Sequence, residues 1–336
     1  MENRVLTIDN VRLSFPVYQG QVNVLNNISL HIDRGEIVGV VGESGSGKSV
    51  TAMLAMRLLP AGSYHIHSGA ITLMGHDMLN LTEKTLRDIR GSKVAMIFQE
   101  PMTALNPTRR IGKQMVDVIR QHRPMSLREA RARAVELLAD MQIADPQSVL
   151  KRYPFELSGG MRQRVMIAIA FSCEPDLLIA DEPTTALDVT VQRQVLRLLK
   201  QKAQATGTAV LFISHDMAVV SQVCDRLYVM YAGAVIESGN TGEVLQQPQH
   251  PYSIGLLNSA PDKGEPRTPL LSIPGTVPNL ARLPAGCAFR ERCFAAGEAC
   301  GITPTLQAHD SAADRQAACW YPQRENAHVC DAINPQ

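Results

Sequence analysis

One eight-residue stretch, GESGSGKS at 42–49, constrains this chain more than any other. It follows the apolar run EIVGVV at 36–41 and precedes the apolar helical run VTAMLAMRLL at 50–59. A glycine-rich turn between a strand and a helix lets backbone N–H groups and the positive helix end face phosphate oxygens. The simpler interpretation is a glycine-rich turn, but the flanking strand and helix are the context that a phosphate-binding loop requires.

Two side chains of this stretch have distinct predicted roles. Lys48 is expected to reach the β- and γ-phosphates of a nucleotide, and the Ser49 hydroxyl to ligate Mg²⁺. The predicted nucleotide-binding residues are Gly42, Glu43, Ser44, Gly45, Ser46, Gly47, Lys48, Ser49 and Val50.

Polar residues also follow three apolar strand patterns. LLIADEP ends in Asp181, which suits Mg²⁺, and Glu182, which could orient or deprotonate the attacking water. VAMIFQ ends in Gln99, which could reach Mg²⁺ or the water, and FISHD places His215 where it could contact the γ-phosphate. An acidic pair after a strand is usually a cap, and a lone histidine is usually structural. The phosphate loop elsewhere in the chain favours the catalytic interpretation.

A second glycine-rich step into a helix is LSGGMRQR at 157–164. Ser158, Gly159 and Gly160 could hold phosphate at a helix N-terminus. The stretch has no lysine, so it is not another phosphate loop, and its simpler interpretation is an N-cap formed by Ser158.

These motifs, together with ALD at 186–188, stand in the order found in ATP-binding cassette proteins, and the chain resembles that family over residues 1–250. The resemblance implies an α/β fold: a P-loop NTPase core with an antiparallel β subdomain and an inserted α-helical subdomain at about 101–157. The helical patterns GKQMVDVIRQH and LREARARAVELLADMQI fall inside that insert. The implied reaction is hydrolysis of ATP to ADP and phosphate, coupled to transport.

The resemblance also implies a dimer of two cassettes, arranged head to tail. Ser158, Gly159 and Gly160 would then contact the ATP held by the opposite subunit, and Asp188 would couple the two sites.

Within one subunit, the resemblance implies that Gln99 senses Mg²⁺, that Glu182 is the catalytic base and that His215 is the switch. An aromatic ring usually stacks on adenine. Phe15 is the candidate and Tyr18 the second choice, while a core position for Phe15 is equally open.

Composition shifts near residue 248, where a Pro- and Gly-rich segment begins, and a small Cys-rich C-terminal appendage is predicted at 251–336. HPYSIGLLNSAP, IPGTVPNL and GCAFRERCFAAGEAC resemble the ATPase subunits of dipeptide and oligopeptide importers. Within that group, TAMLAMRLLPAGSYHIHSG and ISHDMAVVSQVCD most resemble importers of D-alanyl-D-alanine dipeptides.

Four cysteines of the appendage form a candidate ligand set. Their spacing is Cys287-x5-Cys293-x6-Cys300-x18-Cys319. Four thiolates suit Zn²⁺ or an iron–sulfur cluster, and the resemblance implies a [4Fe–4S] cluster that staples a segment with little core of its own. Zinc, and unligated or disulfide-linked thiols, remain alternatives. Cys173 and Cys224 are predicted to be core residues, and Cys330 has no predicted role.

The composition limits where the chain works and what it binds. No apolar run approaches the ~18 residues that span a bilayer, and MENRVLTIDN lacks the apolar region of a signal peptide. A net charge of +1 and 4% aromatic residues argue against nucleic acid as a partner. A cytosolic chain with reduced thiols is expected.

The family implies a peripheral position on the cytoplasmic face of the bacterial inner membrane. The implied partners are a related but distinct second ATPase subunit, two transmembrane permease subunits and, indirectly, a periplasmic peptide-binding protein. EPMTALNPTRRIG, after Gln99, would contact the permease. Two other hypotheses are a cassette ATPase that acts on DNA or ribosomes, and a metal-dependent redox protein.

Overall fold

The computed structural model describes residues 3–18, 20–99, 104–185, 187–259, 272–309 and 314–323. The chain divides into two compact units that alternate along the sequence. The first unit comprises Met1–Leu6, His31–Ile37 and Thr72–Ile213, and the second comprises Thr7–Leu30, Val38–Ile71 and Ser214–Gln336. Within the described ranges, no helix is long and apolar enough to cross a membrane.

The first unit contains a parallel sheet of buried strands. Strand β7 (Leu177–Asp181) pairs in parallel with β6 (Val94–Ile97) on one side and β8 (Ala209–Ser214) on the other. Every residue of β7 and β8 is buried, as expected for continuous apolar runs in a parallel sheet. The crossover from β7 to β8 is α8 (Val189–Thr206), which ends at Gly207 in the left-handed conformation that favours glycine.

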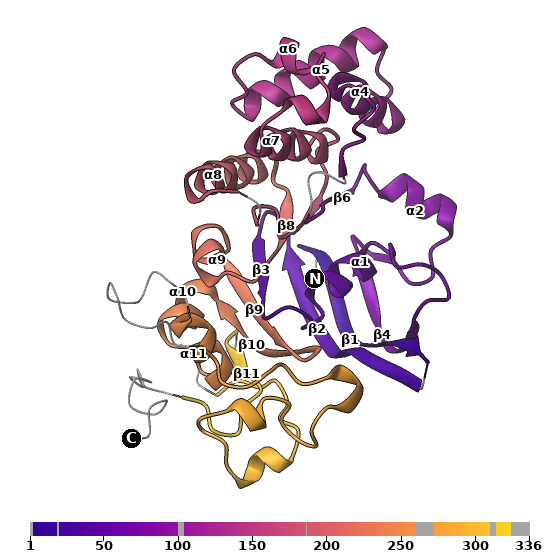
Figure 1. Ribbon diagram of the computed structural model, residues 1–336. Helices are drawn as coiled ribbons and strands as arrows, with labels where there is room; N and C mark the ends of the chain where they lie inside the picture. The colour runs from indigo at the N-terminus through magenta and orange to yellow at the C-terminus, as the bar shows by residue number, and fades with distance from the viewer. Residues whose placement is uncertain are drawn as a thin grey trace. The chain divides into compact units, whose positions relative to one another are not determined.

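Helices fill the long connection from β6 to β7. Those that the structure describes in full are α4 (Ile111–His122), α5 (Leu127–Asp140), α6 (Pro146–Val149), the 3₁₀ turn η1 (Pro154–Glu156) and α7 (Gly159–Ala170). Helix α5 begins with a capping box, because Ser126 and Glu129 each accept the other's backbone N–H. In Figure 1, α4, α5 and α6 lie together, with α7 and α8 between them and the strands of this unit. The unit also contains β5 (His76–Asp77) and α2 (Glu83–Ile89).

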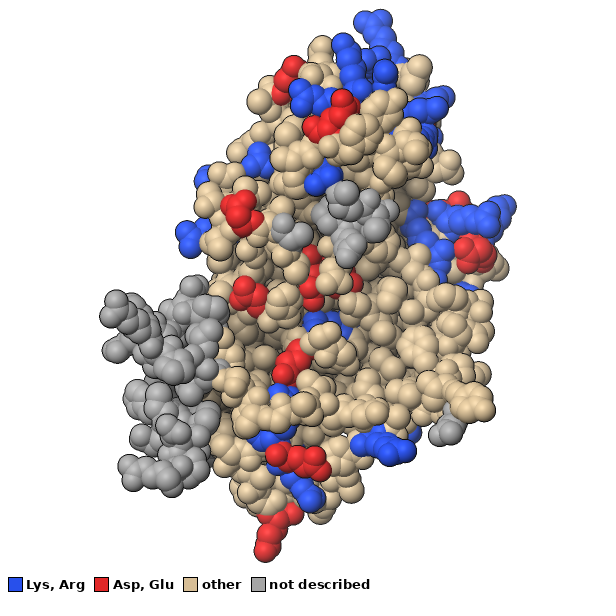
Figure 2. Space-filling view, in the orientation of Figure 1, with Lys and Arg blue, Asp and Glu red and all other residues tan. Residues whose placement is uncertain are grey.

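Basic side chains gather at the outer end of this helical layer (Figure 2). Exposed arginines of α4 and α5 include Arg120, Arg128 and Arg131. Positively charged side chains are therefore concentrated over this part of the face that Figure 2 shows.

The second unit contains most of three long strands. Strand β1 (Arg4–Val17) lies between β2 (Gly20–Asp33) and β4 (His65–Leu73). Two residues connect β1 to β2, and a connection this short joins antiparallel strands.

A second group of strands in this unit positions the glycine-rich stretch. Strand β3 (Ile37–Val41) is buried throughout and pairs in parallel with β9 (Arg226–Tyr231). Strand β9 pairs antiparallel with β10 (Ala234–Asn240), which pairs with the short β11 (Gln316–Ala317). Among its described residues are the helices α1 (Lys48–Ala55), α9 (Met217–Val223), α10 (Thr241–Gln246) and α11 (Pro251–Asn258).

A buried carboxylate attaches the C-terminal part of this unit to β10. Glu237 has an exposed fraction of 0% and accepts the backbone N–H groups of Gln249 and His250, at 2.7 and 2.9 Å. His250 in turn accepts the Tyr252 N–H through Nδ1 at 3.0 Å and so caps α11. The described chain beyond α11 consists of loops, β11 and three 3₁₀ turns. These turns are η3 (Leu280–Arg282), η4 (Arg290–Arg292) and η5 (Glu298–Gly301).

Most predicted core elements are present, with one boundary corrected. The helix predicted at 50–59 begins at Lys48 and ends at Ala55, because Arg57 has a φ of 52° that a right-handed helix excludes. Cys173 and Cys224 are buried in the core, as predicted. Strands β9 and β10 and helix α11 were not predicted, and they carry the attachment of the C-terminal residues.

We expect His250 to make folding stability depend on pH. Burial lowers its pKa from 6.5 to about 3, so between these values the unfolded chain binds more protons and stability falls as pH falls. From about pH 7.5 to about pH 5.5, wild type should lose about 1.4 kcal/mol more free energy of unfolding than His250→Asn, whose amide oxygen can still cap α11. Urea titrations at each pH would measure this difference.

The matched control is His76→Asn, which changes an exposed histidine in β5. It should lose as much stability on acidification as wild type. Equal losses in wild type and His250→Asn would contradict the assignment to His250.

Candidate nucleotide-binding site

The glycine-rich stretch forms a tight loop between β3 and α1. Gly42, Gly45 and Gly47 have φ values of 153°, 82° and 100°, which favour glycine. A Cβ atom on Gly42 would lie 2.1 Å from the carbonyl oxygen of Met230. At position 42, residues other than glycine are therefore excluded both by the backbone conformation and by the lack of space for a Cβ atom.

The Lys48 side chain folds back over this loop. It is 5% exposed, and Nζ donates to the carbonyl oxygens of Gly42 at 2.7 Å and Glu43 at 3.0 Å. A third acceptor is Ser46 Oγ, at 3.5 Å. Because Lys48 is also the first residue of α1, its head group and the positive end of the helix lie at the same loop.

The turn after β9 is hydrogen-bonded to this loop. The Gly233 N–H donates to Ser46 O at 3.1 Å, and Gly233 O accepts the Asn26 N–H at 2.7 Å. Asn26 Nδ2 also donates to Ala232 O at 3.2 Å. Neither Asn26 nor Gly233 was predicted from the sequence, since both act through contacts between segments far apart in the chain.

In the first unit, the predicted base and the predicted sensor lie together. Glu182 follows β7, and its Oε2 accepts Gln99 Nε2 at 3.0 Å and Thr185 Oγ1 at 3.1 Å. The Glu182 backbone has a φ of 47°, and its N–H donates to Ile213 O at 3.0 Å. The preceding residue, Asp181, is 6% exposed. The sequence predicted the roles of Gln99 and Glu182 but not the contact from Thr185.

The second glycine-rich step begins α7. Ser158 caps this helix by accepting the Met161 N–H at 3.3 Å, which confirms the N-cap interpretation; its contact with a nucleotide stays a prediction. A Cβ atom on Gly160 would lie 2.6 Å from Cγ1 of Val191, near the start of α8. Asp188 caps α8 by accepting the Val191 N–H at 3.0 Å. Ser158, Gly159, Gly160 and Asp188 therefore belong to two adjoining helix N-termini.

Three other predicted residues lie in the second unit, as the phosphate loop does. His215 is exposed just after β8, and Phe15 is half-buried near the end of β1. Tyr18, the second choice for stacking on adenine, is 100% exposed. Glu100–Thr103 and Ala186, parts of the predicted permease-contacting segment and of the ALD motif, lie outside the described residues.

The four predicted metal ligands are free thiols that lie near one another. Burial raises the pKa of Cys293 to about 12 and of Cys319 to about 11, and neighbouring thiols of the set add to both shifts. Burial also raises the pKa of Cys287, whose N–H donates to Cys300 O at 2.9 Å. The donor chemistry suits a thiophilic metal.

The arrangement of these side chains does not form a ready ligand set. In the part of the chain that the structure describes, no group of three or more His, Cys, Asp or Glu residues is placed to hold a metal ion. The predicted four-cysteine cluster is therefore not supported by the geometry. The disulfide alternative does not apply to the six described cysteines, which are all free.

Two family models match the chain. Residues 25–185 match the ABC transporter family, and residues 236–300 match the C-terminal region of oligopeptide/dipeptide transporters.

Curated relatives match over almost the whole chain. It is 69% identical over 325 residues to the probable D,D-dipeptide transport ATP-binding protein DdpD of Escherichia coli (strain K12), covering 97% of this chain and 99% of that protein. It is 45% identical over 323 residues to the oligopeptide transport ATP-binding protein OppD of Salmonella typhimurium, covering 96% and 95%.

A solved structure shares the fold. The dimeric ATP-binding cassette MJ0796, in a post-hydrolysis state bound to ADP and Pi, matches with a TM-score of 0.63 and 27% identity. The match covers 70% of this chain and 98% of that chain. The sequence resemblance and the predicted α/β fold are thus confirmed. The chain belongs to the ABC transporter family, as an ATP-hydrolysing subunit of the dipeptide and oligopeptide importers.

Proposed function

We propose that this ATPase drives uptake of D,D-dipeptides or closely similar short peptides. The observation that carries the proposal is the 69% identity to DdpD, over 99% of that protein's length. The chain would sit on the cytoplasmic face of the bacterial inner membrane, against two permease subunits and beside a related second ATPase subunit. A periplasmic binding protein would deliver the peptide. We further propose a nucleotide-binding domain at 1–250 and a C-terminal domain at 251–336.

The phosphate loop would bind the triphosphate through its backbone N–H groups and Lys48. Lys48 would exchange its loop acceptors, the carbonyls of Gly42 and Glu43, for β- and γ-phosphate oxygens. Phe15 would stack on the adenine, and His215 would contact the γ-phosphate. The loop's glycine conformations and the position of Lys48 support this assignment.

Hydroxyl, amide and carboxylate oxygens are donors that Mg²⁺ prefers, and Ser49, Gln99 and Asp181 offer one of each. When bound there, Mg²⁺ would neutralise charge on the transferred phosphoryl group.

Glu182 would accept a proton from the water that attacks the γ-phosphorus, and ADP would leave with the bridging oxygen. The hydrogen bonds from Gln99 and Thr185 support this role, because they hold the Glu182 carboxylate in one orientation.

Replacing the proposed base should separate binding from hydrolysis. Glu182→Gln should bind ATP as wild type does but release phosphate at least about 100-fold more slowly, because the water loses its proton acceptor. Phosphate release from the purified importer complex would measure this. Glu243→Gln, which changes an exposed residue of α10, is the control and should retain full activity. Wild-type turnover in Glu182→Gln would disprove the base assignment.

The helix N-terminus at Ser158 would complete the ATP site of the opposite subunit. Ser158→Asp tests this, because aspartate caps a helix as well as serine does but brings a negative charge to a neighbouring triphosphate. Thermal unfolding should be unchanged, while ATP-driven association of the cassettes should weaken at least about 10-fold. Light scattering with and without ATP, in the Glu182→Gln background, would measure association.

Ser126→Asp provides the matched control, since Ser126 caps α5 in the same way. It should associate as the Glu182→Gln parent does. Normal ATP-driven association of Ser158→Asp would show that this helix end does not face a nucleotide.

We also propose that Cys287, Cys293, Cys300 and Cys319 take up a [4Fe–4S] cluster, with Zn²⁺ as the alternative. The mutual proximity of four half-buried or buried thiols supports the proposal, although their side chains would have to move into a ligand geometry. The raised pKa values of Cys287, Cys293 and Cys319 mean that binding must release protons, so metal affinity should fall as pH falls.

Metal analysis of protein purified without oxygen tests this proposal. Iron and sulfide should be present in wild type and lost in Cys293→Ser, because a ligand is removed. Cys173→Ser, a core cysteine outside the set, should keep both. Zinc without iron would favour the alternative, and wild-type protein with neither metal would overturn both.

A further inference from the structure

Glu43, the second residue of the phosphate loop, is held through three different groups. Its N–H donates to the hydroxyl of Tyr252 at 2.8 Å, and its carbonyl oxygen accepts Lys48 Nζ at 3.0 Å. Its two carboxylate oxygens accept the two terminal nitrogens of Arg292, at 2.8 and 3.0 Å. Two residues from beyond α10 therefore meet the loop at the residue whose carbonyl also binds the predicted phosphate-binding lysine.

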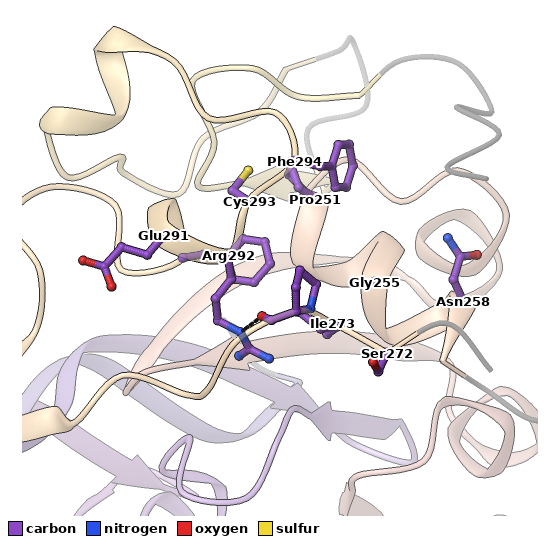
Figure 3. Close-up of a pocket in the computed structure, with 11 residues that line it drawn as sticks. Pro251, Gly255, Asn258, Ser272, Ile273, Glu291, Arg292, Cys293 and Phe294 are labelled. Carbon is purple, nitrogen blue, oxygen red and sulfur yellow. Dashed lines mark hydrogen bonds between the residues drawn. The ribbon is translucent and has the colours of Figure 1, made fainter. Parts of the chain in front are cut away.

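Arg292 also makes contacts besides those with Glu43, and they hold its side chain in place. Its side chain is 6% exposed, and Nε donates to Pro274 O at 2.9 Å (Figure 3). One terminal nitrogen also donates to the Tyr231 hydroxyl at 3.3 Å. The guanidinium lies 5.8 Å from the ring centroids of Tyr231 and of Phe289. The guanidinium is planar, and these contacts hold its two terminal nitrogens in one direction, toward Glu43. A lysine has a single nitrogen and could not make the same paired contact.

The aromatic rings around Arg292 join the C-terminal residues to the sheet. Tyr231, at the end of β9, lies 4.6 Å from Tyr252 and 5.2 Å from Phe289 between ring centroids, and Tyr252 lies 5.3 Å from Phe289. Tyr252 is itself positioned by the cap that His250 provides. The contacts on Glu43 thus come from a packed cluster.

We propose that Arg292 and Tyr252 are positioning residues for ATP, which act through Glu43 on the phosphate loop and on Lys48. By holding the Glu43 carboxylate and N–H, they fix the direction of its carbonyl and the path of the following loop N–H groups. The C-terminal segment thereby sets the affinity of the loop for phosphate. Because Glu182 is held by Gln99 and Thr185 instead, the hydrolysis step itself should depend little on Arg292.

The pKa of Arg292 agrees with this arrangement, since the hydrogen bond to Glu43 is the largest cause that raises it. A cavity of about 280 Å³ borders Arg292, with Pro251, Gly255, Ile273 and Cys293 among its lining residues (Figure 3). If residue 292 had a smaller head group, the space left by the guanidinium would join this cavity. Substitutions by smaller residues therefore displace no neighbouring side chain.

The test uses the full-length chain and its complex, with Arg292→Met, Glu43→Gln and the double variant. Arg292→Met keeps the apolar stem and removes the fork. ATP affinity, measured by titration with a fluorescent ATP analogue, should fall roughly 5- to 20-fold in each single variant. The double variant should be no weaker than the weaker single variant, because both changes break the same contact. KM for ATP should rise, while kcat should stay within about twofold.

Three further proteins sharpen the result. Arg292→Lys keeps the charge without the fork and should recover only part of the affinity. Tyr252→Phe should also weaken ATP binding, because the Glu43 N–H loses its acceptor. Arg290→Met changes an exposed arginine of the same 3₁₀ turn and should bind ATP as wild type does.

Wild-type affinity in Arg292→Met would overturn the proposal, even if thermal stability fell, since the role would then be structural only. Losses that multiply in the double variant would also overturn it, because Arg292 would not be acting through Glu43. A fall in kcat with unchanged affinity would do the same.

Discussion

The buried Lys48 side chain needs hydrogen-bond acceptors, and the phosphate loop supplies them from its own backbone. The carbonyls of Gly42 and Glu43 turn toward Nζ, which requires the positive-φ glycine conformations on either side. A buried cation without such acceptors would be costly. The strand β3, the helix α1 and the turn at Gly233 are arranged around this small loop, and the C-terminal residues contact it through Glu43.

The C-terminal part of the chain is attached to β10 through a buried polar contact. Glu237 is buried in this strand, and its two carboxylate oxygens accept the backbone N–H groups of Gln249 and His250. Because a buried carboxylate is costly unless it is hydrogen-bonded, this contact favours one placement of α11 over others. That placement brings the Tyr252 hydroxyl to the Glu43 N–H, so the attachment of the C-terminal residues and the support of the phosphate loop depend on each other.

Local patterns in the sequence were sufficient to predict the loop, the helical insert and the buried strands β3, β6, β7 and β8. Glycines at 42, 45 and 47, apolar runs and capping serines each act within a few residues of their own position. The contact between Arg292 and Glu43 joins residues 249 positions apart, and no local pattern encodes it. The four cysteines differ again, since their spacing indicated a ligand set but the described side chains are not arranged as one, so the cluster stays a proposal.

Glu182 illustrates why the remaining site geometry could not be read from the motif alone. Its φ of 47° lies in a region that non-glycine residues rarely adopt and that costs free energy. The bond from its N–H to Ile213 O and the bonds from Gln99 and Thr185 to its carboxylate offset that cost. Glu43 and Glu182 are thus positioned by the same means: each acidic residue lies near the end of a buried strand, and side chains from elsewhere in its unit orient its carboxylate. In both cases the motif determines which residue is present, and tertiary contacts determine where its oxygens point.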